Sequence, residues 1–306
     1  MPNDHRNLRA LPLALPLALA AVAALAGCGG PAGTAAQGPS RTAEAQADAQ
    51  ADPRAGAPAG ADARTQAAAR ESGAIPAGPG RKLPLAGKTI VIDPGHNPGN
   101  FRHTAEINKK VNIGTNRKEC DTTGTSTNAG YTEAAFTLDV SHRLRDLLKA
   151  RGAKVVLVHD ADRPYGPCID ERARIGNAAK ADAVVSVHGD GSASGNRGFH
   201  VILPALVQGG GADTTKIVGP SRALGEKLVA SFGRATGSAP ANYIGSGTGL
   251  DVRKDLGGLN LSTVPKVFIE CGNMRDPKDA KLFTDAGWRQ KAAQGIADGI
   301  GAYLKG

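Results

Sequence analysis

The sequence predicts an α/β fold with a single mixed, mostly parallel sheet flanked by helices on both faces. Short apolar runs occur at residues 89–92, 155–158, 183–188 and 266–271. Their length and nearly continuous apolar character are typical of buried parallel strands. Between these runs lie segments in which apolar residues recur at helical spacing. Strands and helices that alternate in this way indicate a layered α/β domain.

The clearest helical segment runs from about residue 132 to 150. Phe136, Val140 and Leu144 recur at the spacing that places them on one helix face, and Thr132 suits the N-cap position. The same patterns predict a further strand at 198–203 and further helices at 170–179, 221–233, 277–285 and 288–304. The polar stretch 97–130 is predicted to be a long, functional loop.

The first part of the chain is predicted to lie outside the folded domain. Residues 1–28 have a basic start and a long Leu/Ala run, which is the layout of a secretory signal. This run ends in Leu25-Ala26-Gly27-Cys28, which resembles the bacterial lipobox and implies cleavage before Cys28 and its acylation. Cleavage without lipidation and an uncleaved membrane anchor are the alternatives. Residues 29–84 are rich in Ala, Gly and Pro and are expected to form a disordered linker. This leaves one domain at 85–306.

The chain of 306 residues has a formal net charge of +9. An exported basic protein can associate with anionic wall polymers or lipid head groups. The charge is equally well explained by an arginine-rich composition that says nothing about partners. We expect no nucleic-acid partner, because the sequence has no basic helix and no interleaving of aromatic and basic residues.

Three predicted strands end at polar residues that suit chemistry. His96 follows the first strand and the turn-forming Pro-Gly pair, His188 ends the strand 183–188, and Glu270 lies at the end of the last strand. In open α/β sheets the carboxyl ends of the strands form the usual site of ligands and catalytic groups. Glu133 lies in the first turn of its helix. Each residue also has a simpler interpretation: a loop histidine, a carboxylate at a helix start, or a salt-bridge partner.

Together these residues match the chemistry of a zinc hydrolase. Two neutral imidazoles and one carboxylate are common protein ligands of a catalytic zinc ion. A second carboxylate can then transfer a proton from water to the leaving amine. The spacing does not determine which of Glu133 and Glu270 is the ligand.

Four motifs in order resemble the zinc-dependent N-acetylmuramoyl-L-alanine amidases of the type-3 family. They read Ile92-Asp93-Pro94-Gly95-His96, Gly130-Tyr131-Thr132-Glu133, Ser186-Val187-His188 and Pro265-Lys266-Val267-Phe268-Ile269-Glu270. The resemblance implies that His96, Glu133 and His188 bind Zn²⁺ and that Glu270 is the general base and acid. It also implies cleavage of the amide between the lactyl group of N-acetylmuramic acid and L-alanine in peptidoglycan. The family fold is a single mixed sheet flanked by helices.

The sequence departs from the common family pattern at two places, and at both it resembles the actinobacterial branch of the family. Residues 97–100 replace the frequent Gly-Gly-x-Asp turn, and residues 271–274 replace Leu-Gly-Phe. That branch tends to pair two loop cysteines, which implies a disulfide between Cys120 and Cys168; export permits it. Cys271 is adjacent to Glu270 in a strand, so we expect a buried thiol on the opposite face of the sheet.

Some assignments stay open. A zinc carboxypeptidase or endopeptidase of the stem peptide would use the same ligands, and a non-catalytic wall-binding lipoprotein is a further alternative. Asp93 and Asp190 either orient a histidine or serve turn geometry. Asn273 is a candidate for placing substrate, and His200 is expected to be a packing or surface residue. Expected partners are peptidoglycan or muropeptides and, through the lipid anchor, the membrane; the expected state is a monomer.

Overall fold

The computed structural model describes residues 82–306. The predicted signal peptide 1–28, the predicted lipidation site Cys28 and nearly all of the predicted linker 29–84 lie outside the described residues. Among the helices of the described part, none combines the length and the apolar character that a membrane span requires.

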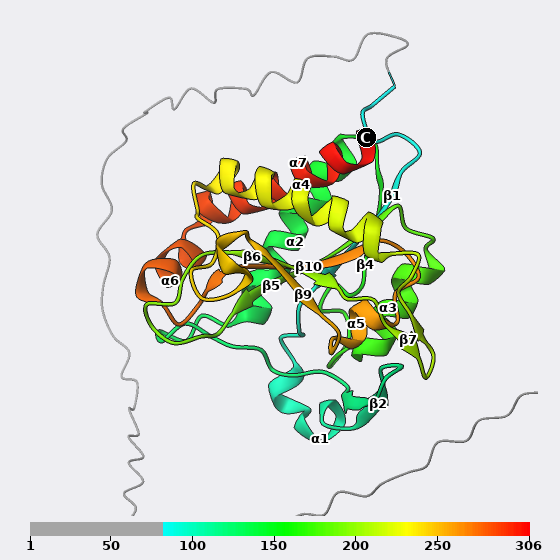
Figure 1. The fold of residues 1–306 in the computed structure, drawn as a ribbon. Helices are drawn as coiled ribbons and strands as arrows, with labels where there is room; N and C mark the ends of the chain where they lie inside the picture. Colours follow the sequence, from blue (N-terminus) through cyan, green and yellow to red (C-terminus); the bar gives the residue numbers. More distant parts are fainter. Residues whose placement is uncertain (1–81) are drawn as a thin grey trace, which may run out of the picture. The chain divides into compact units, whose positions relative to one another are not determined.

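A six-stranded sheet forms the centre of the domain (Figure 1), with the strand order β4-β1-β5-β10-β6-β9. Neighbouring strands are parallel except for β10 and β6, which are antiparallel. The predicted mixed and mostly parallel sheet is therefore confirmed. Its strands are β1 (Thr89–Pro94), β4 (Lys154–Leu157), β5 (Ala183–Asp190), β6 (His200–Pro204), β9 (Leu250–Arg253) and β10 (Lys266–Asn273).

Helices cover both faces of this sheet, as predicted. One face packs against α2, α4 and α7 in a single apolar cluster that includes Ile92, Phe136, Leu224 and Ile296. On the other face, Ile175 of α3 packs against Val91 and Val184, and α5 contacts β6. The helices are α2 (Glu133–Ala150), α3 (Ile169–Ala178), α4 (Val218–Thr236), α5 (Gly257–Asn260), α6 (Pro277–Thr284) and α7 (Ala286–Lys305).

The two faces of the sheet differ in chemistry. Side chains alternate between faces along a strand, and residues paired across neighbouring strands share a face. The register pairs Glu270 with both His188 and His200, and pairs Ile202 with Asp251. The face under α3 and α5 therefore carries polar side chains near the carboxyl end of β5, whereas the face under α2, α4 and α7 is apolar.

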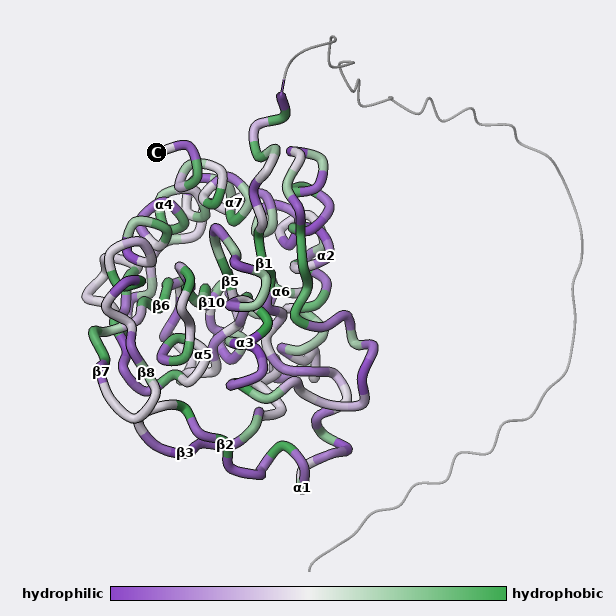
Figure 2. Tube along the Cα trace, turned by 90° about the vertical axis from the view of Figure 1, so that its right-hand side faces the viewer, coloured by the Kyte–Doolittle hydropathy of each residue, from purple (hydrophilic) through white to green (hydrophobic). Residues whose placement is uncertain are grey.

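The stretch 97–130 contains more structure than the predicted loop. It holds a 3-10 turn (Asn100–Arg102), the short helix α1 (Thr104–Ile107), and the hairpin of β2 (Lys110–Asn112) and β3 (Arg117–Glu119). A second small hairpin joins β7 (Gln208–Gly209) to β8 (Ala212–Asp213). Figure 2 shows that the β2–β3 hairpin is largely hydrophilic, whereas β1 is hydrophobic. The sequence signal was missing because strands this short and polar show no apolar alternation.

The apolar cluster predicts a large cost for Phe136→Ala. The Phe136 ring is fully buried, and its centroid lies 4.4 Å from that of Phe283 and 6.4 Å from that of Trp288. We expect the free energy of unfolding, measured by urea denaturation, to fall by about 3–5 kcal/mol. The control Phe101→Ala removes a side chain that is 63% exposed and should change it by less than about 0.5 kcal/mol. Similar effects of the two substitutions would contradict this packing.

Candidate active site

His96 follows β1 in a backbone conformation that is uncommon for residues other than glycine. Its φ angle is +61°, in the left-handed region. The preceding Gly95 is required by close packing, because a β-carbon there would lie 2.4 Å from Cε1 of His188. The Pro-Gly turn thus places His96 beside His188, and the two ring centroids are 5.1 Å apart.

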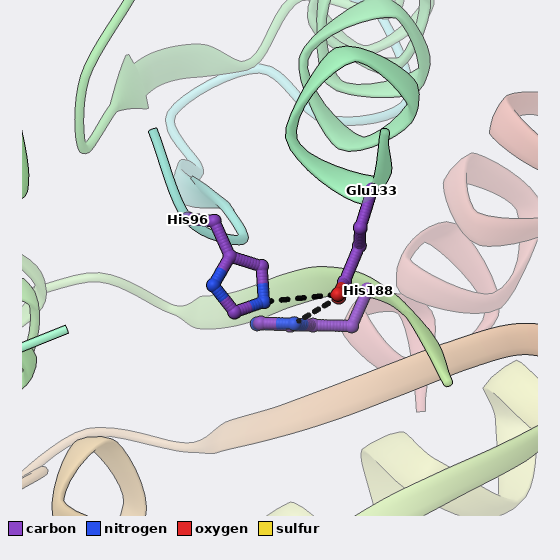
Figure 3. Close-up of side chains that lie close together, drawn as sticks. All are labelled: His96, Glu133 and His188. Atoms are coloured by element: carbon purple, nitrogen blue, oxygen red, sulfur yellow. Dashed lines mark hydrogen bonds and ion pairs between the residues drawn. The ribbon is translucent and has the colours of Figure 1, made fainter. Parts of the chain in front are cut away.

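Glu133 lies between these histidines. It is the first residue of α2, and the predicted N-cap Thr132 accepts a hydrogen bond from the backbone N–H of Ala135 at 3.3 Å. The Glu133 carboxylate has Oε2 at 3.1 Å from Nε2 of His96 and Oε1 at 2.9 Å from Nδ1 of His188 (Figure 3). Backbone N–H groups of Thr125 and Gly189 donate to the same carboxylate. Its position is therefore fixed from several sides.

The potential ligand atoms of His96, Glu133 and His188 all lie within 4.8 Å of one another. Two imidazole nitrogens and one carboxylate oxygen form a donor set that suits a catalytic zinc ion. Burial alone would lower the pKa of His96, but Glu133 and Asp121 raise it to about 10. Burial would raise the pKa of Glu133, but the two histidines lower it well below its usual range. The cluster is thus a concentrated site of opposite charges, and its residues fit the implied metal.

Glu270 reaches the same place from β10. It lines a cavity of about 410 Å³ together with His96, Glu133 and His188. Its Oε2 atom is buried without a hydrogen-bond partner in the described part of the chain. Burial, together with the negative charges of Glu133 and Asp190, raises the pKa of Glu270 well above its usual value. All four residues singled out from the sequence therefore meet at one cavity.

A buried ionic network behind His96 was missed by the sequence analysis. The Arg172 guanidinium of α3 donates to the carboxylates of Asp93 at 2.7 Å and Asp121 at 2.9 Å. It also donates to the backbone carbonyls of Pro94, His96 and Pro167. These are five acceptors for the five N–H groups of an arginine. No local pattern marks Arg172. Lys266, which binds Asp93 at 3.0 Å, did offer a signal: a charge within an apolar strand.

This network shows which aspartate lies beside the His96 imidazole. Asp93 is paired with Lys266 and Arg172, and among residues 82–306 it forms no hydrogen bond or ion pair with an imidazole. Instead, Asp121 Oδ1 lies 3.6 Å from Nδ1 of His96. The same Nδ1 is 3.0 Å from the carbonyl oxygen of Thr122, and because a carbonyl only accepts, Nδ1 carries the proton. Nε2 is therefore the ring nitrogen of His96 that can bind a metal ion.

The other open residues also have defined contacts. Asp190 accepts a hydrogen bond from the Tyr243 hydroxyl. Asn273 is fully buried and its amide donates to carbonyls of the 192–196 loop, so it holds that loop instead of facing the cavity. His200 is buried on the polar face beside Glu270, with Nδ1 unpaired among the described residues.

Cys120 and Cys168 are joined by a disulfide. Cys120 directly precedes Asp121, and Cys168 is the N-cap residue of α3, which carries Arg172. The bond therefore ties together the two segments that form the network behind His96. Cys271 is a buried free thiol in the apolar cluster, as predicted.

Comparison with known proteins agrees with this geometry. Residues 90–302 match the family described as N-acetylmuramoyl-L-alanine amidase. The chain belongs to this family. N-acetylmuramoyl-L-alanine amidase Rv3717 from Mycobacterium tuberculosis is 40% identical over 225 residues, which span 72% of this chain and 88% of that protein.

Solved amidase structures share the fold. The amidase Ami1 from Mycobacterium smegmatis superposes with a TM-score of 0.67 at 37% identity, covering 72% of this chain and 98% of that one. Apo Ami1 from Mycobacterium abscessus gives a TM-score of 0.66 at 39% identity, covering 72% and 100%. The predicted family, fold class and amidase activity on peptidoglycan are therefore confirmed.

The buried network predicts a pH-dependent effect of Asp93→Asn. Burial opposes ionisation of Asp93, but Lys266 and Arg172 outweigh it and lower its pKa below the usual range. This stabilisation is present above the unfolded-state pKa of about 3.9 and is lost as the pH falls toward the folded-state pKa. At pH 7 the substitution should lower the free energy of unfolding by about 3–5 kcal/mol, because it removes the counter-ion of the buried Lys266 ammonium and one of the two carboxylates that pair with Arg172.

Urea unfolding at pH 7 and pH 3 checks this expectation, and the difference between variant and wild type should narrow at pH 3. Asp146→Asn is the matched control, since the Asp146 side chain is 67% exposed and its ion pair in the described part of the chain is with Arg145 at the surface. A difference that does not change with pH would contradict the ionised state of Asp93.

Proposed function

We propose that this protein is a zinc-dependent hydrolase that cleaves the amide between the lactyl group of N-acetylmuramic acid and L-alanine. The main support is the meeting of His96, Glu133, His188 and Glu270 at one cavity. Membership of the amidase family supports the choice of bond over the carboxypeptidase and endopeptidase alternatives. The presence of a complete donor set and an additional carboxylate argues against a non-catalytic wall-binding role.

In this proposal His96, Glu133 and His188 hold the zinc ion. When bound, zinc polarises the scissile carbonyl and lowers the pKa of a water molecule. Nδ1 of His96 donates its hydrogen bond to the Thr122 carbonyl, so Nε2 is the ring nitrogen that can bind the metal ion. The His188 ring stacks on Phe268 with a centroid distance of 5.2 Å, which limits its rotation.

Glu270 is proposed to move the proton. Its carboxylate accepts a proton from the attacking water and then delivers this proton to the nitrogen of the departing L-alanine. Two features of the site support this role. Oε2 has no competing hydrogen-bond partner among residues 82–306, and the apolar side chains of Leu256 and Phe268 line the same cavity.

Glu270→Gln tests this division of roles. The variant should keep its zinc and lose about 10²- to 10⁴-fold in kcat, because the amide cannot accept the proton. His188→Ala should lose both zinc and activity, since it removes a ligand. Metal analysis and mass analysis of digested muropeptides measure the two outcomes, and a chelator should abolish wild-type activity. Zinc loss in Glu270→Gln, or release of D-alanine as the product, would contradict the proposal.

The proposed cellular arrangement is an exported, lipid-anchored monomer at the outer face of the membrane. Residues 1–28 form the signal peptide, 29–84 the linker, and 85–306 the catalytic domain. Acylated Cys28 attaches the protein, and the linker lets the domain reach peptidoglycan. The support is the sequence Leu25-Ala26-Gly27-Cys28 and a substrate that lies in the cell wall.

Cys28→Ala should release the protein from the membrane fraction, because acylation requires the thiol. Fractionation with immunodetection measures this, and the fraction released into the medium should rise at least about tenfold, since two acyl chains are needed for stable attachment. Cys271→Ala is the control, and it should remain in the membrane fraction. Continued membrane attachment of Cys28→Ala would favour an uncleaved anchor.

A further inference from the structure

Arg253 lies in the cavity of the zinc ligands but has no part in the mechanism above. It is the last residue of β9, the edge strand beside β6. Asp251 pairs with Ile202 on the polar face, and alternation along β9 places Arg253 on that same face. Its side chain lines the cavity together with Glu270 and His188.

A neighbouring carboxylate fixes the orientation of the Arg253 guanidinium. Nε donates to Oδ1 of Asp255 at 2.9 Å, and Nη2 donates to Oδ2 at 2.7 Å. Asp255 is itself held by Lys118, whose Nζ donates to the Asp255 backbone carbonyl at 3.0 Å. The arginine is thus fixed along one edge before any ligand binds.

The other edge of this guanidinium is open. Nη1 makes no hydrogen bond to another residue in the range 82–306, and Asp255 uses one of the two N–H groups of Nη2. The remaining donors form the fork that binds a carboxylate through two parallel hydrogen bonds. The side chain of Arg253 is 37% exposed, so a ligand in the cavity can reach this edge.

The charges around the cavity make this edge selective. Glu133, Glu270 and Asp190 line the cavity with carboxylates, and Arg253 is the one lysine or arginine among its lining residues. Among the lining residues that hold no metal, Arg253 is therefore the fixed positive charge that attracts an anionic group of the substrate. No acid other than Asp255 forms an ion pair with Arg253 within the described part of the chain.

We propose, on the basis of the proposed function, that Arg253 binds a carboxylate of the stem peptide. This contact makes the enzyme selective for peptides that carry the carboxylate. After L-alanine, the stem peptide continues with D-glutamate joined through its γ-carboxyl group. The α-carboxyl group of this residue is free in some peptidoglycans and amidated in others. We assign it as the partner of Arg253; a carboxylate on the third residue is the other source.

The test uses the zinc-loaded full chain and two defined substrates, N-acetylmuramoyl-L-alanyl-γ-D-glutamate and its D-isoglutamine counterpart. The wild type should have a kcat/KM at least about tenfold higher on the free acid. Arg253→Gln should lower kcat/KM on the acid by about 10- to 100-fold, mostly through KM, as expected for a hydrogen bond to a charged group. The same variant should stay within about twofold on the amide.

Two control variants accompany this test. Arg222→Gln removes an equal charge from the surface of α4 and should change neither rate. Arg253→Lys keeps the charge but loses the planar fork, so it should retain only part of the preference. Binding of the dipeptide L-alanyl-γ-D-glutamate to Glu270→Gln, measured by calorimetry, should weaken by the same factor when Arg253→Gln is added.

The outcomes separate this inference from the proposed function. Cleavage of neither substrate by the zinc-loaded wild type would refute the proposed function. Equal cleavage of both would refute the α-carboxyl group of D-glutamate as the partner of Arg253. Equal losses of Arg253→Gln on both substrates, with a shifted pH profile, would mean that Arg253 acts on Glu270 and would also overturn the inference. A muramoyl tripeptide and its counterpart amidated only on the third residue test the other carboxylate, which is the partner if wild-type cleavage falls on that amidation.

Discussion

The site depends on the hydrogen bonds of one buried arginine. Arg172 is 5% exposed and uses its full set of donors on the turn after β1, on two aspartates and on the segment before α3. The left-handed backbone of His96 costs of order 1–3 kcal/mol and persists only where the surroundings enforce it. Arg172 holds this backbone in place because it donates hydrogen bonds to the carbonyl oxygens on both sides of Gly95.

The two faces of the sheet have different roles: one stabilises the domain, and the other carries the groups that can take part in chemistry. The face toward α2, α4 and α7 is filled with close-packed apolar side chains, and this packing stabilises the domain. The opposite face carries charged and polar groups, which are costly to bury unless they are paired. Asp93 and Lys266 are paired in this way, whereas Oε2 of Glu270 has no hydrogen-bond partner among residues 82–306. Glu270 also lines the cavity, together with the candidate metal ligands.

Much of the fold and of the site could be predicted from the sequence, because both follow from local patterns. Apolar runs identified the central strands, helical spacing identified the long helices, and strand ends identified His96, His188 and Glu270. Arg172 and Asp121 could not be found in this way. Their roles come from contacts between segments far apart in the sequence, which no periodicity records. For Asp93, the sequence left two interpretations open, and the structure gives it a third role as partner of Arg172 and Lys266.

The three residues of the candidate metal cluster come from three separate elements: the turn after β1, the first turn of α2, and β5. None of these three elements supplies more than one of the donors. Donor convergence therefore exists only when the sheet, its helix layer and the turn between them are assembled at the same time. The amount of bound metal would consequently show whether these three elements have folded together, before any catalytic rate is measured.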